Sequence, residues 1–384
     1  MKKIAVFTGA RSEYGLLYQL IKHLHVNEDV SLQLIVGGMH LTPEFGYTVT
    51  EIEKDGFPIA EKIDFLLSSG SAVGTAKSMG LALIAASDCL ERLRPDLLVI
   101  LGDRTESLAI AQAAMVTRIP IAHIHGGEIT EGAIDEAIRH SLTKMSHLHF
   151  TSTEEYRKRV IQLGEQPDRV FNVGAPGIDN IVKLKLLSWD ELQQSLPFSL
   201  SPKYIVMTYH PVTLLADDGV NDLKNLLDVI EEHSEYDVVI TYPNADSSSH
   251  RVIELLKAFH EKNVTRVKVA QSLGQVRYLS VLKYCQAVVG NSSSGIIEAP
   301  SFGIPTINIG ARQKGRVCSD SVLHSDGSPD SLRQCFSQIT NPSFQKKCRT
   351  LENPYGQGTA SERIAEVLLS TPFDKILSKT FYDI

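Results

Sequence analysis

Short apolar runs alternate with amphipathic segments along the first half of the chain. The apolar runs lie at 3–8, 31–36, 96–101, 119–124, 147–152 and 169–174, and segments with helical spacing, such as 14–25 and 132–145, separate them. Strands that alternate with helices are typical of a parallel sheet covered by helices on both faces. The pattern predicts a doubly wound α/β domain over residues 1–180.

The same alternation restarts after a less regular segment at 187–202. Further apolar runs lie at 204–208, 237–241, 267–270, 287–290 and 305–309. Two domains also suit a length of 384 residues, because a single hydrophobic core stops growing at roughly 250–300 residues. We expect a second α/β domain over residues 181–365, facing the first across a cleft, with ligands at the carboxyl ends of the strands.

Composition narrows the function classes. With 43% hydrophobic and 22% charged residues the chain is an ordinary globular protein, and its net charge of −7 argues against nucleic-acid binding. No apolar run approaches the roughly 20 residues that span a bilayer, and the N-terminal run is too short for a signal peptide. The five cysteines are widely spread, which predicts free thiols rather than a zinc site or disulfides. We therefore expect a soluble, cytoplasmic protein with neither a nucleic-acid nor a membrane partner.

Two loops of small residues follow predicted strands and are candidates for binding a diphosphate. Arg11 stands in the first loop, after Gly9, at the start of a helical segment. Ser292 and Ser293 follow the run at 287–290 and precede another helical segment, whose backbone N–H groups and dipole favour an anion. The alternative for both loops is structural, a strand-to-helix turn in the first and a serine cap in the second.

Charged residues near the second loop extend this hypothesis. Glu298 lies in the first turns of the segment after the serines, where a carboxylate is suited to a ribose diol or simply complements the helix dipole. A basic loop at 310–316 carries Arg312 and Gly315 and holds three cations in an acidic protein, which suggests an anion. A solvated run of charges is the alternative for this loop.

Titratable residues gather at strand ends in the first domain and once in the second. Asp103 and Arg104 follow the run at 96–101, and His125 and Glu128 follow the run at 119–124; the other members of the set are His40, Asp135, Arg139 and His210. Acid/base chemistry needs titratable groups in differing environments around one substrate atom. Asp135 and Arg139 are four residues apart, so a helix-surface ion pair also explains them.

Seven motifs, taken together and in order, resemble the hydrolysing UDP-N-acetylglucosamine 2-epimerases of sialic acid synthesis. They are RSEY (11–14), GDR (102–104), HIHGGE (123–128), DEAIRH (135–140), HPVT (210–213), GNSSSG (290–295) and GARQKGR (310–316). The resemblance implies a GT-B arrangement of two Rossmann-like domains, with a tail, 366–384, that packs back on the first domain. It implies an enzyme that needs no cofactor and no metal.

The implied reaction removes the C2 proton and eliminates UDP, and water then adds to the 2-acetamidoglucal to give UDP and N-acetylmannosamine. By resemblance, Asp103, Glu128 and Asp135 are the acid/base candidates, and His210 lies near the diphosphate or sugar. Animal-type relatives have HIEGGE where this chain has HIHGGE, which makes His125 a further acid/base candidate. The nucleotide contacts implied are Arg11, Ser292, Ser293, Glu298, Arg312 and Gly315, with His40 closer to the sugar, and we expect a homodimer or homotetramer.

Three other functions stay open from the sequence. A related hydrolysing 2-epimerase acts on UDP- or GDP-linked diacetylbacillosamine for legionaminic acid synthesis, and the loops at 41–47 and 66–77 would contact the part of the sugar that differs. A GT-B glycosyltransferase would need an acceptor for turnover. A sugar-nucleotide sensor would bind UDP without turnover, and would leave the acid/base set without a purpose.

Overall fold

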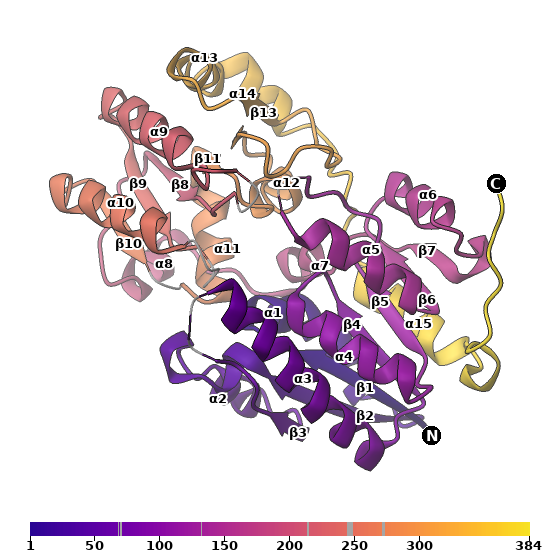
Figure 1. Cartoon of the computed structure of the whole chain (residues 1–384). Helices are drawn as coiled ribbons and strands as arrows, with labels where there is room; N and C mark the ends of the chain where they lie inside the picture. Colours follow the sequence, from indigo (N-terminus) through magenta and orange to yellow (C-terminus); the bar gives the residue numbers. More distant parts are fainter. Residues whose placement is uncertain (68, 70, 132, 213–214, 244–248, 271–272) are drawn as a thin grey trace. The chain divides into compact units, whose positions relative to one another are not determined.

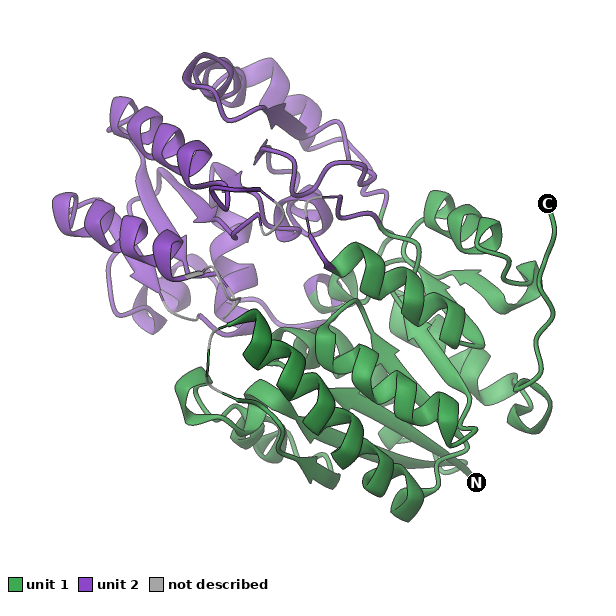
Figure 2. Cartoon of the chain, viewed as in Figure 1, with its two compact units in different colours: residues 1–128, 135–180, 355–384 green, residues 129–134, 181–354 purple. Residues whose placement is uncertain are grey.

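The computed structural model describes residues 1–67, 69, 71–131, 133–212, 215–243, 249–270 and 273–384. The chain divides into two compact units, each built on its own parallel sheet (Figure 1). Unit 1 comprises Met1–Glu128, Asp135–Asn180 and Tyr355–Ile384, and unit 2 comprises Ile129–Ile134 and Ile181–Pro354 (Figure 2). Both sheets are of the doubly wound α/β type that the sequence predicts.

The sheet of unit 1 has seven parallel strands in the order β3-β2-β1-β4-β5-β6-β7. In chain order the elements are β1 (Lys2–Thr8), α1 (Arg11–His25), β2 (Val30–Gly37), α2 (Val49–Lys54), β3 (Ile59–Ile63), α3 (Ala72–Leu93), β4 (Leu97–Leu101), α4 (Thr105–Val116), β5 (Ile121–Ile124), α5 (Asp135–Met145), β6 (Leu148–Thr151), α6 (Glu154–Gln162), β7 (Val170–Asn172), α7 (Pro176–Lys183) and α15 (Ala360–Ser370).

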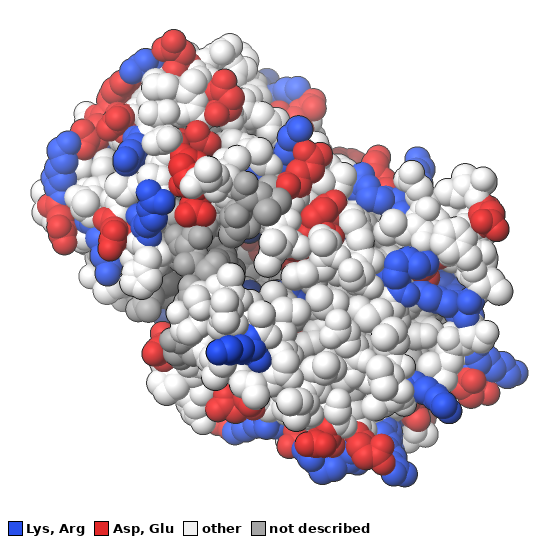
Figure 3. All heavy atoms as spheres, in the orientation of Figure 1, with Lys and Arg blue, Asp and Glu red and all other residues white. Residues whose placement is uncertain are grey.

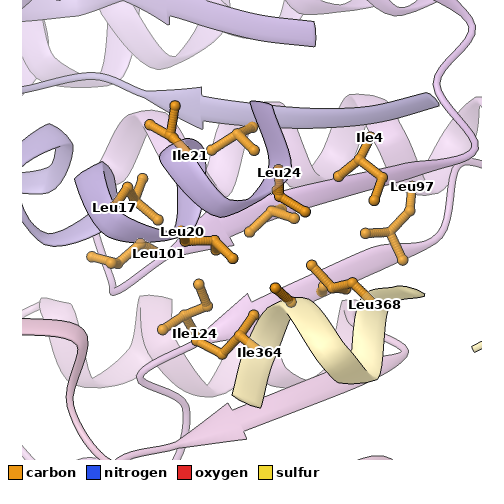
Figure 4. Packing of buried hydrophobic residues seen from close by; sticks show 14 of the residues in the cluster. Ile4, Leu17, Leu20, Ile21, Leu24, Leu97, Leu101, Ile124, Ile364 and Leu368 are labelled. Carbon is orange, nitrogen blue, oxygen red and sulfur yellow. The ribbon is translucent and has the colours of Figure 1, made fainter. Parts of the chain in front are cut away.

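Both faces of this sheet are buried, which explains why its central strands are almost wholly apolar. On one face, Ile4 and Val6 of β1 pack with residues of α1 and α15 (Figure 4). On the other face, Ala5 and Phe7 belong to a cluster that includes residues of α3, α4 and α5. The alternation of side chains along β1 therefore supplies two separate cores.

Helix α15 is fixed to unit 1 at both ends. The carboxylate of Asp179 accepts hydrogen bonds from the backbone N–H groups of Ala360 (2.9 Å) and Ser361 (2.6 Å), and so caps the helix start. The Lys2 ammonium donates to the carbonyls of Leu368 (3.0 Å) and Thr371 (2.7 Å) at the helix end, where a cation also complements the helix dipole.

These contacts change the predicted domain boundaries. The sequence placed residues up to 365 in the second domain, whereas the chain from Tyr355 onwards belongs to unit 1. The reason is the apolar face of α15, because Ile364 and Leu368 are fully buried in the core of unit 1. A second difference is Ile129–Ile134, a short segment inside the predicted first domain that belongs to unit 2.

The sheet of unit 2 has six parallel strands in the order β10-β9-β8-β11-β12-β13. Its elements are α8 (Trp189–Ser195), β8 (Tyr204–Thr208), α9 (Val220–Glu232), β9 (Asp237–Thr241), α10 (Ser249–Lys262), β10 (Val267–Ala270), α11 (Gln275–Tyr284), β11 (Ala287–Gly290), α12 (Ser294–Ile297), β12 (Thr306–Ile309), β13 (Val322–Ser325), α13 (Pro329–Ile339) and α14 (Pro342–Cys348). Residues of α9, α10 and α13 line one core, and residues of α8 and α11 line the other.

Several elements were not predicted, among them β3, β13 and α8. β3 and β13 are edge strands of five and four residues, IAEKI and VLHS, in which two consecutive polar residues leave too short an apolar run to stand out. The segment at 187–202 contains α8, which begins with a capping box between Ser188 and Glu191. Among the described residues, no helix has the length and apolar character needed to cross a membrane.

Candidate functional site

Each sheet has a point where the order of strands reverses, and the candidate residues lie there. In unit 1 the reversal falls between β1 and β4, and in unit 2 it falls between β8 and β11. Open α/β sheets bind ligands beyond the carboxyl ends of the strands at such points. The loops that begin at Gly9, Gly102, Tyr209 and Asn291 are therefore the places where ligand-binding groups are expected.

At the ends of β1 and β4, two buried carboxyl groups flank the backbone of Gly9. Glu13 accepts a hydrogen bond from the Gly9 N–H (2.8 Å), and burial raises the pKa of the Glu13 carboxyl to about 7. A Cβ atom on Gly9 would lie 2.8 Å from the Glu106 side chain, so only glycine fits. Burial alone would raise the pKa of Glu106, but the Arg104 guanidinium, 2.5 Å away, brings it below its usual value.

Arg11 and Arg104, both predicted nucleotide or substrate contacts, occupy this edge. Arg11 is the first residue of α1 and is partly exposed. The guanidinium of Arg104 contacts Met39 Sδ at 3.4 Å in addition to Glu106. Arg104 therefore holds the Glu106 carboxylate, a residue that the sequence did not single out.

His40 makes hydrogen bonds inside unit 1, and its assignment as a sugar contact stays a prediction. The ring is fully buried, and its two nitrogens lie within hydrogen-bond distance of the hydroxyls of Thr8 (3.0 Å) and Thr48 (2.8 Å). Burial lowers the pKa of His40 to about 4, so the ring is neutral at ordinary pH. Through these two bonds His40 joins the end of β1 to the start of α2.

Asp103 and Arg139 form an ion pair that joins the end of β4 to helix α5. The Arg139 side chain is 1% exposed and that of Asp103 is 25% exposed, so the pair is shielded from water on one side only. Arg139 also donates to the backbone carbonyl of Glu128 (2.9 Å) and to the Glu136 carboxylate (3.3 Å). Arg139 thus ties together two of the predicted acid/base positions.

His125 and Glu128 form a buried pair at the end of β5. The His125 Nδ1 atom lies 2.5 Å from Glu128 Oε1, which also accepts a hydrogen bond from the Ser152 hydroxyl (2.9 Å). The other ring nitrogen, Nε2, is buried and has no hydrogen-bond partner among the described residues. A carboxylate on Nδ1 fixes the tautomer and leaves Nε2 as an acceptor. This is the arrangement of a proton-accepting histidine.

The backbone around this pair is held in an uncommon conformation. His125 has φ of +66° and Gly127 has φ of +78°, and a left-handed conformation at a residue other than glycine costs about 1–3 kcal/mol. A Cβ on Gly127 would lie 2.4 Å from the Tyr156 carbonyl oxygen, so the second glycine of HIHGGE is required by packing. Such strain is found where the surrounding structure fixes a functional side chain.

Asp135 is the first residue of α5 and is partly exposed. The next residue of the same helix, Glu136, accepts from His140 Nε2 (3.0 Å) as well as from Arg139. The expectation that Asp135 and Arg139 share a helix face agrees with their spacing within α5. Arg139 nevertheless pairs with Asp103, 36 residues away in the chain.

In unit 2, the Asn291 side chain holds the backbone of His210 through two hydrogen bonds. The Asn291 carboxamide accepts a hydrogen bond from the His210 N–H (2.6 Å) and donates to the His210 carbonyl (2.8 Å). His210 is 8% exposed, and its Nδ1 has no partner among the described residues. Burial, and then the nearby charge of Arg312, place the pKa of His210 well below its usual value. The imidazole is therefore neutral, and it serves as a hydrogen-bonding group rather than a cation.

The loop 310–316 approaches the same asparagine from the other side. The backbone carbonyl of Asn291 accepts hydrogen bonds from the side chains of Arg312 (3.2 Å) and Gln313 (2.8 Å). Gly290, just before it, has φ of +134°, and a Cβ there would meet the Thr208 carbonyl at 2.0 Å. Asn291, Arg312 and His210 are thus brought to one place in unit 2, at the ends of β8 and β11.

The serine loop differs from the prediction in one respect. Helix α12 is only four residues long, Ser294–Ile297, so the predicted contribution of a helix dipole is wrong in this form. Ser293 makes no capping hydrogen bond with its side chain. Ser294 donates to the Glu298 carboxylate, which lies just past the end of the helix, and burial raises the pKa of Glu298 despite that bond.

Sequence reasoning missed several residues of this region. Ser152, Glu13, Glu106 and Asn291 were not chosen as site residues, because each is a common residue type at a strand or helix end. The signal for Asn291 was its place directly after β11, and the signal for Glu13 was its place four residues after Gly9, at the start of a helical segment. Thr213 of the HPVT motif and residues 68 and 70 of the loop 66–77 lie outside the described residues.

Comparison with known proteins agrees with this geometry. The family model described as UDP-N-acetylglucosamine 2-epimerase matches residues 22–369. The chain is 40% identical to a GDP/UDP-N,N'-diacetylbacillosamine 2-epimerase (hydrolyzing) of Campylobacter jejuni, over 100% of this chain and 99% of the relative. It is 38% identical to the polysialic acid biosynthesis protein P7 of Escherichia coli, over 100% of this chain and 98% of the relative.

The fold has a counterpart among solved structures. A UDP-GlcNAc 2-epimerase from Neisseria meningitidis, solved with UDP-GlcNAc bound, superposes with a TM-score of 0.82 over 97% of this chain and 100% of that chain, at 21% identity. At that identity the likeness concerns the fold, which is of the GT-B type predicted from the motifs. The match over most of the chain and the full-length relatives place this protein in the UDP-N-acetylglucosamine 2-epimerase family.

Proposed function

We propose that this protein is a hydrolysing 2-epimerase, which releases UDP from a UDP-linked 2-acetamido sugar and returns the free sugar inverted at C2. The observation that carries the proposal is the buried His125–Glu128 pair, in which Nε2 of His125 has no hydrogen-bond partner among the described residues. A proton acceptor oriented by a carboxylate suits the removal of a weakly acidic C–H proton. Family membership supports the same reaction.

The reaction balances in two steps. In the first, a base takes the C2 proton, the C1–O bond breaks with its electron pair leaving on UDP, and a C1=C2 double bond forms. In the second, water supplies a hydroxyl group to C1 and a proton is delivered to C2 from the opposite face. One acceptor and one donor of protons are needed, and the departing diphosphate needs positive charge or hydrogen-bond donors.

Unit 1 supplies the acid/base groups in this proposal. His125 Nε2 accepts a proton, and Glu128 fixes the ring and stabilises the imidazolium that forms. Asp103 and Asp135 remain candidates for the second proton transfer, with Arg139 holding Asp103 in place. Because Glu128 already bonds His125 and Ser152, we assign it an orienting role.

Unit 2 supplies the groups for the nucleotide. Arg312 provides positive charge, His210 and the serines Ser292 and Ser293 provide hydrogen bonds, and Glu298 is suited to a ribose diol. Arg11 of unit 1 is a further nucleotide contact in the proposal. Ser293→Ala and Arg312→Ala should each weaken UDP binding and leave the thermal unfolding temperature unchanged. Unchanged UDP affinity in both variants, measured by calorimetry, would refute this assignment.

For the sugar, similarity favours diacetylbacillosamine over N-acetylglucosamine, the first expectation from the sequence. The Campylobacter jejuni relative, which is 40% identical to this chain, is named as an epimerase of the diacetamido sugar. The polysialic acid protein, at 38%, keeps N-acetylglucosamine as the alternative. Either sugar places the enzyme in the synthesis of a nonulosonic acid, and so of a surface polysaccharide.

NMR of turnover in D2O tests the reaction and the sugar together. We expect UDP, the free 2-epimer and deuterium at C2 to appear at equal rates, with UDP-linked diacetylbacillosamine preferred over UDP-N-acetylglucosamine. A product that keeps its C2 hydrogen would exclude elimination. Turnover that requires an added sugar acceptor would identify a glycosyltransferase, and UDP binding without turnover would identify a sensor.

We further propose that the protein is a homo-oligomer whose subunits meet at α3. Val73, Leu81 and Ile84 of this helix are 65%, 41% and 65% exposed, and the surface over α3 and α4 carries few charges (Figure 3). A two-fold axis near the middle of α3 would pair Leu81 with Ile84 of the partner subunit and Lys77 with Asp88 of the partner subunit.

Light scattering after size exclusion tests this assembly. Ile84→Asp should lower the mass to that of one chain, whereas Val264→Asp, at another exposed apolar position in unit 2, should leave the mass unchanged. A wild-type protein that elutes as a monomer, or an Ile84→Asp variant that stays oligomeric, would exclude the α3 interface.

A further inference from the structure

The loop 310–316 binds the segment 129–131, which lies between the predicted acid/base residues Glu128 and Asp135. Arg316 Nε donates to the Ile129 carbonyl (3.2 Å), and a terminal nitrogen of Arg316 lies 3.4 Å from the Thr130 hydroxyl. The Lys314 ammonium lies 3.1 Å from the Glu131 carboxylate. All of these residues belong to unit 2. Three consecutive residues are thus held by one loop.

The loop 310–316 and the segment 129–131 also pack closely against each other. Gly315 has φ of +83°, and a Cβ at that position would lie 2.9 Å from Ile129 Cγ2. Thr130 is 2% exposed, and its carbonyl accepts a hydrogen bond from the Ala133 N–H (3.0 Å). A side chain at 315 would therefore both strain the loop and displace Ile129. This gives Gly315, predicted as a nucleotide contact, a packing reason to be glycine.

The same loop is stiff and bonds the nucleotide region on its other side. Two turn hydrogen bonds, Lys314 N–H to Ala311 carbonyl (3.0 Å) and Arg316 N–H to Gln313 carbonyl (3.2 Å), fix its conformation. Gln313 and Arg312 bond the Asn291 carbonyl, and Asn291 bonds His210. A short, internally bonded loop therefore links the proposed nucleotide-binding residues to the segment at 129–131.

Chain continuity carries the link onwards to the acid/base residues. Ile129 is joined by a peptide bond to Glu128, which orients His125, and α5 begins with Asp135 a few residues further on. We propose that Arg316 is a positioning residue, which holds the 129–131 backbone so that Glu128 is set for catalysis when the nucleotide loop is in place. The inference rests on the proposed epimerase function.

Three substitutions test the role of Arg316. Arg316→Gln removes the charge and the forked donors, Arg316→Lys retains one donor for the Ile129 carbonyl, and Arg333→Gln is a matched control on an ion pair with Glu232 elsewhere in unit 2. Misplacing a catalytic group by about 1 Å can cost roughly a hundredfold in rate. We expect kcat of Arg316→Gln to fall about 10- to 100-fold, with KM and the UDP dissociation constant within about threefold of wild type.

The conservative variant separates positioning from a merely structural role. Arg316→Lys should recover at least part of the lost kcat, and Arg333→Gln should behave as wild type. A tenfold or greater loss of UDP affinity in Arg316→Gln with little change in kcat would make Arg316 a nucleotide ligand and overturn the proposal. Equal behaviour of Arg316→Gln and Arg333→Gln would overturn it as well.

Hydrogen exchange keeps the inference independent of turnover. Amides within residues 125–140 should exchange faster in Arg316→Gln than in Arg333→Gln, with equal melting temperatures showing that both variants fold. If Arg316→Gln does not fold, Arg316→Lys takes its place in the comparison. Exchange that is the same in the Arg316 variant and the control would exclude the link even if wild type proves to be an active epimerase. Wild type that turns over no sugar nucleotide would overturn the proposed function and, with it, the catalytic part of this inference.

Discussion

Removal of the Asn291 carboxamide should destabilise unit 2 far more than removal of an ordinary surface amide. Asn291 is fully buried and satisfies both backbone groups of His210, at 2.6 Å and 2.8 Å. In Asn291→Ala the N–H and C=O of His210 lose these partners, and each unsatisfied buried group costs about 1–3 kcal/mol. We expect a loss of ~3 kcal/mol in the free energy of unfolding, with part of the cost relieved if water enters.

The single tryptophan makes this loss measurable in unit 2 alone. Trp189 lies on α8 with its ring 6.2 Å from that of Tyr204 and 5.5 Å from that of Tyr284, so its fluorescence reports the unfolding of that unit. The assay is urea denaturation followed by tryptophan fluorescence. Asn225→Ala is the matched control, because its side chain is half-buried and donates a single bond, to the Gly327 carbonyl at 3.0 Å.

The two asparagine variants should differ clearly. Asn225→Ala should cost about 1 kcal/mol or less, as for one ordinary hydrogen bond. UDP affinity should fall in Asn291→Ala and stay unchanged in Asn225→Ala, because the Asn291 side chain holds His210, a proposed nucleotide contact. If the two variants lost the same free energy of unfolding, the conclusion that the Asn291 side chain holds the His210 backbone would be wrong.

The remaining predictions concern unit 1. Asp179→Ala should lower the free energy of unfolding by about 2–3 kcal/mol in calorimetry, because two buried N–H groups of α15 lose their cap; a variant as stable as wild type would contradict this. Ser152→Ala should lower kcat about 3- to 10-fold without changing KM, since it removes a hydrogen bond that Glu128 Oε1 accepts, and an unchanged kcat would show that this bond does not contribute to catalysis. The free energy of unfolding should fall as pH decreases from about 6.5 to about 4. Folded His40 has a pKa of about 4, whereas His40 in the unfolded chain takes up a proton near its usual pKa. This difference lowers the free energy of unfolding by about 3 kcal/mol over that interval. His40→Gln should flatten this part of the stability curve in calorimetry, and an unchanged slope would show that another group causes it.

The sequence predicted the central strands and the strand-end residues well, for a physical reason. Strands such as β4 and β11 are buried on both faces, so they appear as continuous apolar runs, and the residues that follow them had to lie at the carboxyl edge of a sheet. Edge strands such as β3 lack that signal, because one side is open and the run is short. The predicted boundary at 365 divided α15 between the two domains, because the partners that hold this helix on unit 1, Lys2 and Asp179, lie far away in the chain.

Pairings between distant residues could not be predicted from the sequence for the same reason. Arg139 could pair with Asp135 on its own helix, and only the fold brings it to Asp103. Likewise the tail after α15 reaches back through Lys379, which bonds the buried Glu165 carboxylate at 2.9 Å across a separation of 214 residues. Residue type and spacing give a list of candidates, whereas the roles depend on which partner each one meets.

Those partners decide which candidate is the better proton acceptor. Asp103 accepts a charged hydrogen bond from the buried Arg139 guanidinium, so a proton on its bonded oxygen must break that ion pair. His125 is in the opposite position, because Glu128 Oε1 lies 2.5 Å from its Nδ1 atom and Nε2 has no partner among the described residues. A proton taken by Nε2 creates a cation that Glu128 already faces, and the pair gains attraction as the reaction proceeds. In the proposed reaction the carboxylates of unit 1 therefore act mainly by fixing cations and rings, and we propose His125 as the group that moves the C2 proton.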